Sequence, residues 1–480
     1  MLKTFFIFLC IILFSQIQSL PTINEKNSPN EDQDDKSLTR NTMKTLDEIL
    51  HRIKEFNSTI NHQLYYFRGS KTDTTRKNSI DNEVMENPDL FQGDMILTKT
   101  QADDLVENVV EIAKDLGADV SDIFGNAETR KKRKIDMSAN FTWDLTIPYT
   151  FDNHVKKELI REALNKLQNE TCLSFKEYSD FIPQGQAGLK YIYGQGCYSN
   201  VGRAHQDKHQ IISIGKGCEL ISTIQHETMH ALGFVHEQSR DDRNRYLKVY
   251  LENVKPGTEE NFIKLGSKKA KRYDIPYDYG SAMHYSSYAF TKNKEPTMLP
   301  LNPVYKKTLG SKSEATFLDI KLLNKHYCSN KCSSRITCTN NGYQDPNSCE
   351  RCKCLKGFTG RDCSEIEKDI SCGDQELFAD DNNKTLNIKG KKDCVYHIRS
   401  KDENKNVSIV VGKVNIYPTY GLFCYAGNRL EVKFESDKTK SGAFVCSKTG
   451  ETFESEDNYA IIYYKSMEDA NYANIYYQLK

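Results

Sequence analysis

Four side chains in one short stretch have the types and the spacing of a hydrolytic metal site. His226 and His230 are four residues apart, so on a helix they lie on the same face and both reach one ion. Gly233 ends that helix in a left-handed turn, and His236 then approaches the ion from another direction. Three imidazoles leave one position of a zinc ion open for water, and Glu227 is placed to take the proton of that water. The pattern predicts one Zn²⁺ per subunit and the hydrolysis of peptide bonds.

The motif HExxH is short, and in many helices such histidines are ordinary packed core residues. In this chain the motif extends to HExxHxxGxxH and is followed by a methionine in Ser281-Ala282-Met283-His284-Tyr285. This extended form is the metzincin pattern of zinc peptidases. The extension favours a zinc site over a structural histidine.

Length, charge and the first residues predict an exported chain of several domains. A chain of 480 residues is too long for one hydrophobic core and predicts about three or four domains. Lysine plus arginine equals aspartate plus glutamate at 66 each, so no net charge favours nucleic acid or an anionic membrane. Residues 1–19 have the pattern of a signal peptide, and their apolar run, 4–14, is too short for a membrane span. We therefore expect a secreted, extracellular protein with no membrane span.

The cysteines agree with an oxidising compartment. The chain has 15 cysteines, and loss of Cys10 with the signal peptide leaves an even set that predicts seven disulfides. Candidate N-glycosylation sequons also fit secretion, at Asn57, Asn140, Asn169, Asn383 and Asn406.

Residues 20–133 have the features of a removable propeptide. They contain no cysteine, and apolar residues recur at helical spacing from Met43 to Phe56 and from Leu105 to Leu116. A basic run at 130–134 ends the segment. Such a run is often only a solvated stretch, but its place just ahead of a new domain in a secreted chain predicts cleavage by a furin-type protease.

The segment from residue 134 to 328 is predicted to form an α+β domain. An amphipathic helix is expected over 155–167, and alternating strands are expected over 188–193 and 209–214, directly before the metal-binding helix. Helix, strands and a further helix around one core make an α+β fold.

With these segments the chain resembles the astacin family of metzincin zinc endopeptidases. The stretch 226–243 (HETMHALGFVHEQSRDDR) is similar to the zinc signature of the family, 196–202 to its edge-strand region, and 212–218 to its strand before the active-site helix. The resemblance implies disulfides Cys197–Cys218 and Cys172–Cys328. It also implies that Met283 is an apolar floor under the imidazoles rather than a ligand.

The resemblance assigns roles to two more residues. Tyr285 has the position of a tyrosine that binds zinc, swings away when substrate binds and then hydrogen-bonds the oxyanion, and a phenol suits both roles. A packed core tyrosine is the alternative. Glu237 resembles the glutamate that contacts the new amino terminus of mature astacins. The signature departs from the family at Asp241 and Asn244, which alters the following loop but no ligand, and cleavage at 133 or 134 leaves the contact of Glu237 in doubt.

A propeptide switch is predicted at Phe91-Gln92-Gly93-Asp94. FxGD alone indicates only a turn, but this one lies inside the segment expected to be removed. It resembles the family's switch, in which the carboxylate of Asp94 takes the place of the catalytic water on zinc.

Two further modules follow the catalytic domain. Residues 329–366 resemble an EGF-like module, with the expected pairs Cys332–Cys349, Cys338–Cys352 and Cys354–Cys363, although six cysteines allow 15 connectivities. Residues 367–480 resemble an all-β CUB sandwich with the pairs Cys372–Cys394 and Cys424–Cys446. Asn428 stands where calcium-binding CUB modules tend to have aspartate, so no calcium site is predicted.

The resemblance therefore predicts a secreted, latent zinc endopeptidase of extracellular proteins. The expected partners are protein or peptide substrates, extracellular matrix or cuticle, and an activating furin-type protease. The alternative is a catalytically silent adhesion protein that uses its EGF-like and CUB modules for binding. Intact Glu227 beside three intact ligands argues against this alternative.

Overall fold

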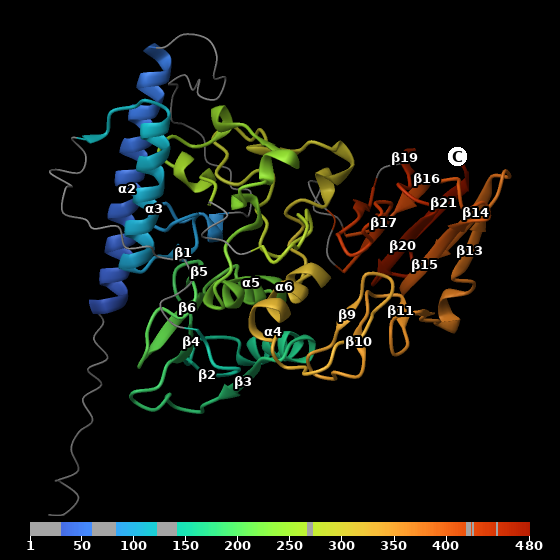
Figure 1. Ribbon diagram of the computed structural model, residues 1–480, viewed down its shortest axis with the longest axis horizontal. Coiled ribbons are helices and arrows are strands. Elements are labelled where there is room, and N and C mark those ends of the chain that lie inside the picture. Colours follow the sequence, from blue (N-terminus) through green and yellow to red (C-terminus); the bar gives the residue numbers. More distant parts are fainter. Residues whose placement is uncertain are drawn as a thin grey trace, which may run out of the picture.

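The computed structural model describes residues 30–59, 83–121, 142–265, 272–418, 424, 427–447 and 450–480. The expected signal peptide at 1–19, the basic run at 130–134 and the sequon at Asn140 lie outside these residues, and so does the side chain of Asn57. Figure 1 shows a pair of helices beside a central α+β unit, followed by a small segment with short strands and a β-sandwich.

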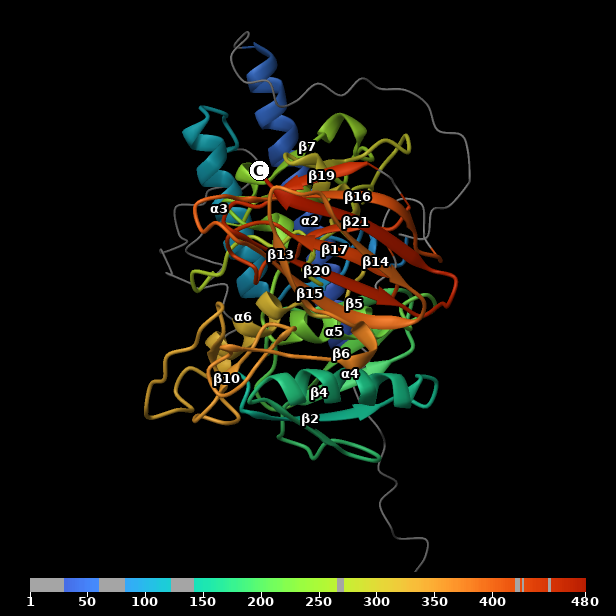
Figure 2. The same cartoon turned by 90° about the vertical axis from the view of Figure 1, so that its right-hand side faces the viewer.

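The paired helices are α2 (Asn30–Thr59) and α3 (Lys99–Asp115), which lie side by side in both views (Figures 1 and 2). Their contact buries the apolar residues whose spacing predicted helices, among them Met43, Leu46, Ile49, Leu105 and Val109. A capping box between Thr98 and Gln101 starts α3. Helix α2 begins well before the apolar pattern, in a stretch of acidic residues that suits a helix amino terminus. The 3₁₀ turn η2 (Glu83–Met85) lies between the two helices in the chain.

A six-stranded sheet forms one layer of the central unit. Its order is β1 (Met95–Ile96), β5 (Cys197–Asn200), β6 (His209–Ile214), β4 (Gly188–Ile192), β2 (Thr146–Phe151) and β3 (Ser174–Glu177). All neighbours are parallel except β5 and β6. The region expected at a sheet edge, β5, is covered by β1, which pairs Met95 with Ser199 and Ile96 with Asn200. A strand from residues 20–133 thus closes this side of the sheet.

Three helices complete the central unit. Helix α4 (Lys157–Glu170) buries Ile160, Ala163, Leu164 and Leu167, the stripe that an amphipathic helix presents to a core. Helix α5 (Ile221–Ala231) contacts α4 as well as β5 and β6, and every residue from Thr223 to Ala231 is buried. Helix α6 (Phe317–Tyr327) starts with a capping box between Thr316 and Asp319.

Short elements connect α5 to α6. They are the 3₁₀ turns η5 (Glu237–Ser239), η6 (Arg243–Arg245), η7 (Leu251–Asn253), η8 (Glu259–Phe262) and η9 (Pro303–Lys307), and the antiparallel pair β7 (Leu247–Val249) and β8 (Met298–Pro300). Because regular structure is sparse here, side-chain hydrogen bonds hold many of these loops.

The segment after α6 consists of two short antiparallel pairs, β9 (Tyr343–Gln344) with β10 (Cys352–Lys353) and β11 (Phe358–Thr359) with β12 (Glu365–Ile366). Its core is small, and three disulfides cross-link it, Cys332–Cys349, Cys338–Cys352 and Cys354–Cys363. Such a segment depends on its cross-links because it buries little apolar surface.

The remaining chain is a β-sandwich that begins after the turn η10 (Ile370–Cys372). One sheet has the order β13 (Glu376–Ala379), β15 (Lys392–Ser400), β20 (Tyr459–Ser466), β17 (Arg429–Lys433) and β18 (Ala443–Val445). The other has the order β14 (Lys384–Lys389), β21 (Tyr472–Leu479), β16 (Val407–Asn415) and β19 (Glu451–Glu454). Disulfides Cys372–Cys394 and Cys424–Cys446 lie in this part.

The sandwich packs directly on the central unit, as both views show (Figures 1 and 2). One continuous hydrophobic cluster contains Tyr279, Tyr305 and Leu309 together with the core of the sandwich. The Thr308 hydroxyl donates to Gly442 O at 3.0 Å and accepts from Phe444 N at 3.0 Å. The two parts therefore share a core rather than only a linker.

Candidate functional site

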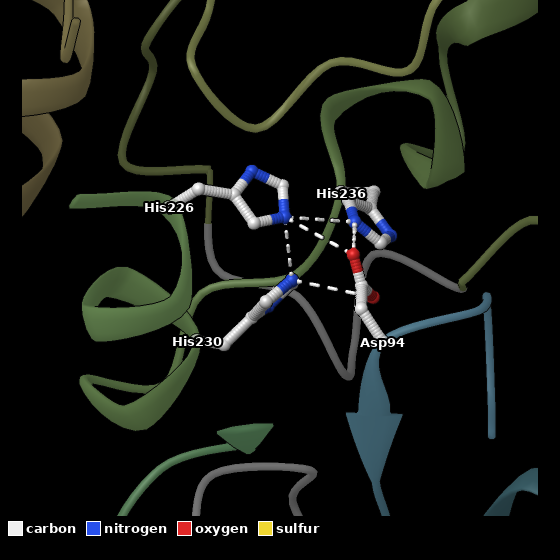
Figure 3. A group of neighbouring side chains, drawn as sticks. All are labelled: Asp94, His226, His230 and His236. Carbon is white, nitrogen blue, oxygen red and sulfur yellow. Dashed lines mark hydrogen bonds and ion pairs between the residues drawn. The ribbon is translucent and has the colours of Figure 1, made fainter. Parts of the chain in front are cut away.

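The three predicted histidines converge with Asp94 in one buried group (Figure 3). The Nε2 atom of His226 lies 3.0 Å from that of His230 and 3.3 Å from that of His236. Two nitrogens bound to one tetrahedral zinc ion are about 3.3 Å apart, since each Zn–N bond is about 2.0–2.1 Å long. The histidine cluster therefore has the dimensions of a zinc site.

The other ring nitrogens fix how the imidazoles are used. His226 Nδ1 lies 2.7 Å from Ala282 O, His230 Nδ1 lies 2.7 Å from Phe234 O, and His236 Nδ1 lies 2.9 Å from Gln92 Oε1. An oxygen acceptor at each Nδ1 assigns the proton to that atom and leaves a lone pair on each Nε2. Burial lowers the pKa of His230 and lowers that of His236 to about 3, which also favours neutral rings.

Asp94 completes the group from the other side. Its Oδ2 lies 3.2 Å from His226 Nε2 and 3.1 Å from His236 Nε2, and its Oδ1 lies 3.6 Å from His230 Nε2. The carboxylate and the three Nε2 lone pairs are all acceptors, and acceptors converge in a buried space only around a cation. The donor set therefore fits zinc held by His226, His230, His236 and Asp94.

Glu227 is completely buried next to this group. Neither of its carboxylate oxygens has a hydrogen-bond partner in the part of the chain that the structure describes. Burial, and secondly the charge of Asp94, raise the pKa of Glu227 well above its ordinary value. A buried carboxylate without a partner is costly and is characteristic of functional sites.

Tyr285 and Met283 lie beside the histidines. The Tyr285 ring packs against the His236 ring with centroids 4.5 Å apart, and its hydroxyl donates to the backbone oxygen of Gln92. Met283 is 3% exposed and belongs to the same apolar cluster as Met229 of α5. It packs into the core, as the resemblance implied.

Asp319 holds the turn that contains Met283, and sequence reasoning did not assign this residue. Its two oxygens accept from Ser281 Oγ at 2.7 Å and from Ala282 N at 2.9 Å. Ala282 in turn supplies the carbonyl that orients His226. The capping box that starts with Thr316 was a signal for the start of α6, but it gave no indication of this long-range contact.

Glu237 is held by neighbours within the enzyme part. Its Oε1 accepts from Arg240 at 2.9 Å and from Asp278 N at 2.9 Å, and burial raises its pKa to about 8. Asp278 also accepts from Ser441 N of the sandwich at 3.0 Å. The residues that would form a new amino terminus are outside the described ranges, so the contact of Glu237 with that terminus stays a prediction.

The remaining predicted residues lie away from the histidines. Disulfides join Cys172 to Cys328 and Cys197 to Cys218, the pairs that the resemblance implied. The side chains of Asn169 and Asn383 are exposed and that of Asn406 is half-buried. None of the helices in the described part of the chain has the length and apolar character needed to span a bilayer.

A zinc-dependent peptidase of the metzincin class is what this fold and this histidine group define. Residues 136–328 match the model of the peptidase family Astacin, and the chain belongs to this family of zinc metalloendopeptidases.

Comparison with known proteins gives relatives from nematodes. Zinc metalloproteinase nas-37 of Caenorhabditis elegans is 33% identical over 82% of this chain and 48% of its own length. Zinc metalloproteinase nas-34 of the same organism is 31% identical over 83% of this chain and 65% of its own length. The hatching enzyme zinc-protease HCE-1 of Oryzias latipes is 31% identical over 38% of this chain and 88% of the solved chain, with a TM-score of 0.34. The chain thus spans less than two thirds of these curated nematode relatives.

Proposed function

We propose that this chain is a secreted zinc endopeptidase that is made as a latent proenzyme and hydrolyses peptide bonds of extracellular proteins. The observation that carries the proposal is the convergence of three imidazole Nε2 atoms with Asp94 beside the buried, unpartnered carboxylate of Glu227. A catalytically silent adhesion protein would gain nothing from keeping Glu227, because burying this group destabilises the fold.

The roles of the residues follow from their places. Zinc, when bound by the three histidines, lowers the pKa of water and polarises the substrate carbonyl. Glu227 accepts the proton of the attacking water and delivers it to the leaving amine. The Tyr285 hydroxyl donates a hydrogen bond to the oxyanion that forms on the former carbonyl oxygen. His226, His230 and His236 hold their orientation through their Nδ1 hydrogen bonds.

Latency is proposed to come from Asp94. Its carboxylate occupies the position that water needs, and β1 tethers it to β5 on the same chain. Tethering gives the carboxylate a high effective concentration at the zinc site until the segment is cut and diffuses away. We take residues 20–133 as the propeptide and a furin-type protease acting at 130–134 as the activator.

The modules and the compartment complete the proposal. Seven disulfides favour export to an oxidising compartment, after removal of residues 1–19. We assign 134–328 to the catalytic domain, 329–366 to the EGF-like module and 367–480 to the CUB module. Proteins of an extracellular matrix or cuticle are the proposed substrates.

The first test is cleavage of a peptide library by processed protein with and without a chelator. Glu227→Gln is expected to keep its zinc and fold but to lose about 10²–10⁴-fold in turnover, because the general base is gone. His226→Ala is expected to lower zinc occupancy as well, measured by metal analysis. The control Glu219→Gln lies just before α5 and should cleave like the unmodified protein. Near-normal cleavage by Glu227→Gln would exclude the assigned role.

The second test concerns latency and uses protein whose basic run is replaced to prevent processing. Adding Asp94→Ala is expected to release activity on a small fluorogenic peptide, because the metal position opens while the rest of the segment stays docked. Equal silence with and without Asp94→Ala would mean that bulk occlusion, rather than Asp94, maintains latency.

A further inference from the structure

The loop that carries Asp94 has an unusual backbone. Gln92 and Gly93 both have left-handed conformations, with φ of 50° and 80°. Gly93 is required because a Cβ there would lie 2.3 Å from Met85 O. Gln92 is not glycine, so its positive φ is strained, and such strain persists only where surrounding contacts compensate for it.

Those contacts come from the side chain and the carbonyl of Gln92, which is fully buried. Its Oε1 accepts from His236 Nδ1 at 2.9 Å and from Ser239 Oγ at 2.8 Å. Its backbone oxygen accepts from the Tyr285 hydroxyl. One strained residue of the propeptide thus contacts a zinc ligand and the proposed oxyanion donor.

The three ligands differ in who orients them. Ala282 and Phe234, which orient His226 and His230, are backbone carbonyls of the enzyme part and stay after processing. The partner of His236 is a side chain of the segment that leaves. Cleavage therefore removes an orienting hydrogen bond from one ligand only.

We propose that Gln92 is a positioning residue of the latent state, acting through His236 and Tyr285 beside the switch residue Asp94. Its Oε1 holds His236 with Nε2 toward the zinc position, and its carbonyl keeps the Tyr285 hydroxyl engaged. Latency then has two parts: Asp94 fills the metal position, and Gln92 tightens the ligand set around it. This inference rests on the proposed role of Asp94 and extends it.

The test measures zinc release to a chelator from uncleaved protein with the basic run replaced. Gln92→Met removes the acceptor at similar size and is expected to speed release by about 10–100-fold, the usual effect of losing an outer hydrogen bond to a ligand. Gln92→Glu keeps an acceptor oxygen and should stay near the unmodified rate. After processing, all these variants leave the same enzyme and should release zinc equally.

Gln101→Met is the matched control. Gln101 is also a buried glutamine of the propeptide and donates to Val201 O at 2.9 Å, but it is not among the Nδ1 partners of the ligands. If Gln101→Met speeds release as much as Gln92→Met, the effect is general docking and the inference is wrong. Release from Gln92→Met at the unmodified rate would also overturn it.

A second readout needs no variant. In protein with ¹⁵N-labelled histidine, the Nδ1 proton of His236 should exchange slowly before processing and fast afterwards, while His226 and His230 do not change. Equal exchange of His236 in both forms contradicts the inference. The failure of Asp94→Ala to release activity would instead contradict the proposed latency itself, so the two failures are distinguishable.

Discussion

At the residue scale, the chemistry of the site is divided between groups that sequence spacing reveals and groups that it hides. The histidines and Glu227 lie within eleven consecutive residues, so helix geometry and one glycine suffice to predict that they meet. Gln92 and Asp319 reach the same site from 144 residues before His236 and 38 residues after Ser281. Contacts over such separations leave no periodic pattern in a sequence.

Tyr285 can be tested separately from the zinc ligands. Tyr285→Phe is expected to lower kcat by about 10²–10³-fold with a smaller effect on KM, since the hydroxyl is needed mainly in the transition state. Tyr279→Phe is the control, because its hydroxyl donates to Tyr246 O and not to a group at the site. Steady-state kinetics of processed protein measure both. A change confined to KM would indicate a packing role for Tyr285.

At the scale of elements, periodicity predicted helices and strands better than their neighbours. The apolar spacing in 155–167 and the alternation in 188–193 and 209–214 became α4, β4 and β6. The pairing of β1 with β5 could not be predicted, because a strand of two residues has no alternation to recognise. The strand expected at the sheet edge is therefore an inner strand while the preceding segment is docked.

One junction between elements has a pH dependence that can be worked out. His397 of β15 is 1% exposed, with Nε2 donating to Gly357 O at 3.0 Å and Nδ1 accepting from the Tyr459 hydroxyl. Burial lowers the pKa of His397 to about 4. Its unfolded pKa is about 6.5, so the unfolded state binds more protons below that value. Stability from this group is complete above about pH 6.5 and is lost as the pH falls toward 4.

The expected loss is roughly 3 kcal/mol for a shift of this size. The free energy of unfolding of the unmodified protein should therefore fall from pH 7 to pH 4.5 by more than that of His397→Gln, which has no imidazole to protonate. Chemical denaturation at several pH values measures both. The exposed His154 gives the control, and His154→Gln should keep the full dependence. Equal slopes for His397→Gln and the unmodified protein would show that His397 is not responsible.

At the scale of the whole molecule, sequence similarity indicated separate modules in a row, whereas the structure has a catalytic part and a sandwich that share one core. Cysteine spacing and glycines show where modules begin and end. They contain no information on docking, which depends on Tyr305, Thr308 and Asp278 meeting residues 130 or more positions later. The sandwich thus contacts Asp278, whose amide also holds Glu237 next to a zinc ligand.

The shared core predicts cooperative unfolding. Thr308→Val leaves Phe444 N and Gly442 O buried without partners, at a cost of about 1–3 kcal/mol for each group. Calorimetry of processed protein should show one transition for the unmodified form and two for Thr308→Val. Thr297→Val is the control, because this buried hydroxyl bonds only within the catalytic part. It should lower the melting temperature without dividing the transition.

The strand β1 also affects the solution behaviour of the processed protein. When residues 20–133 leave, β5 loses its parallel partner, and its outward amide and carbonyl groups become free to pair with another extended chain. An incoming peptide can use them, but so can a second copy of the same protein. The propeptide then protects against self-association during storage, and freshly processed enzyme should be most prone to precipitate when substrate is scarce and protein concentration is high.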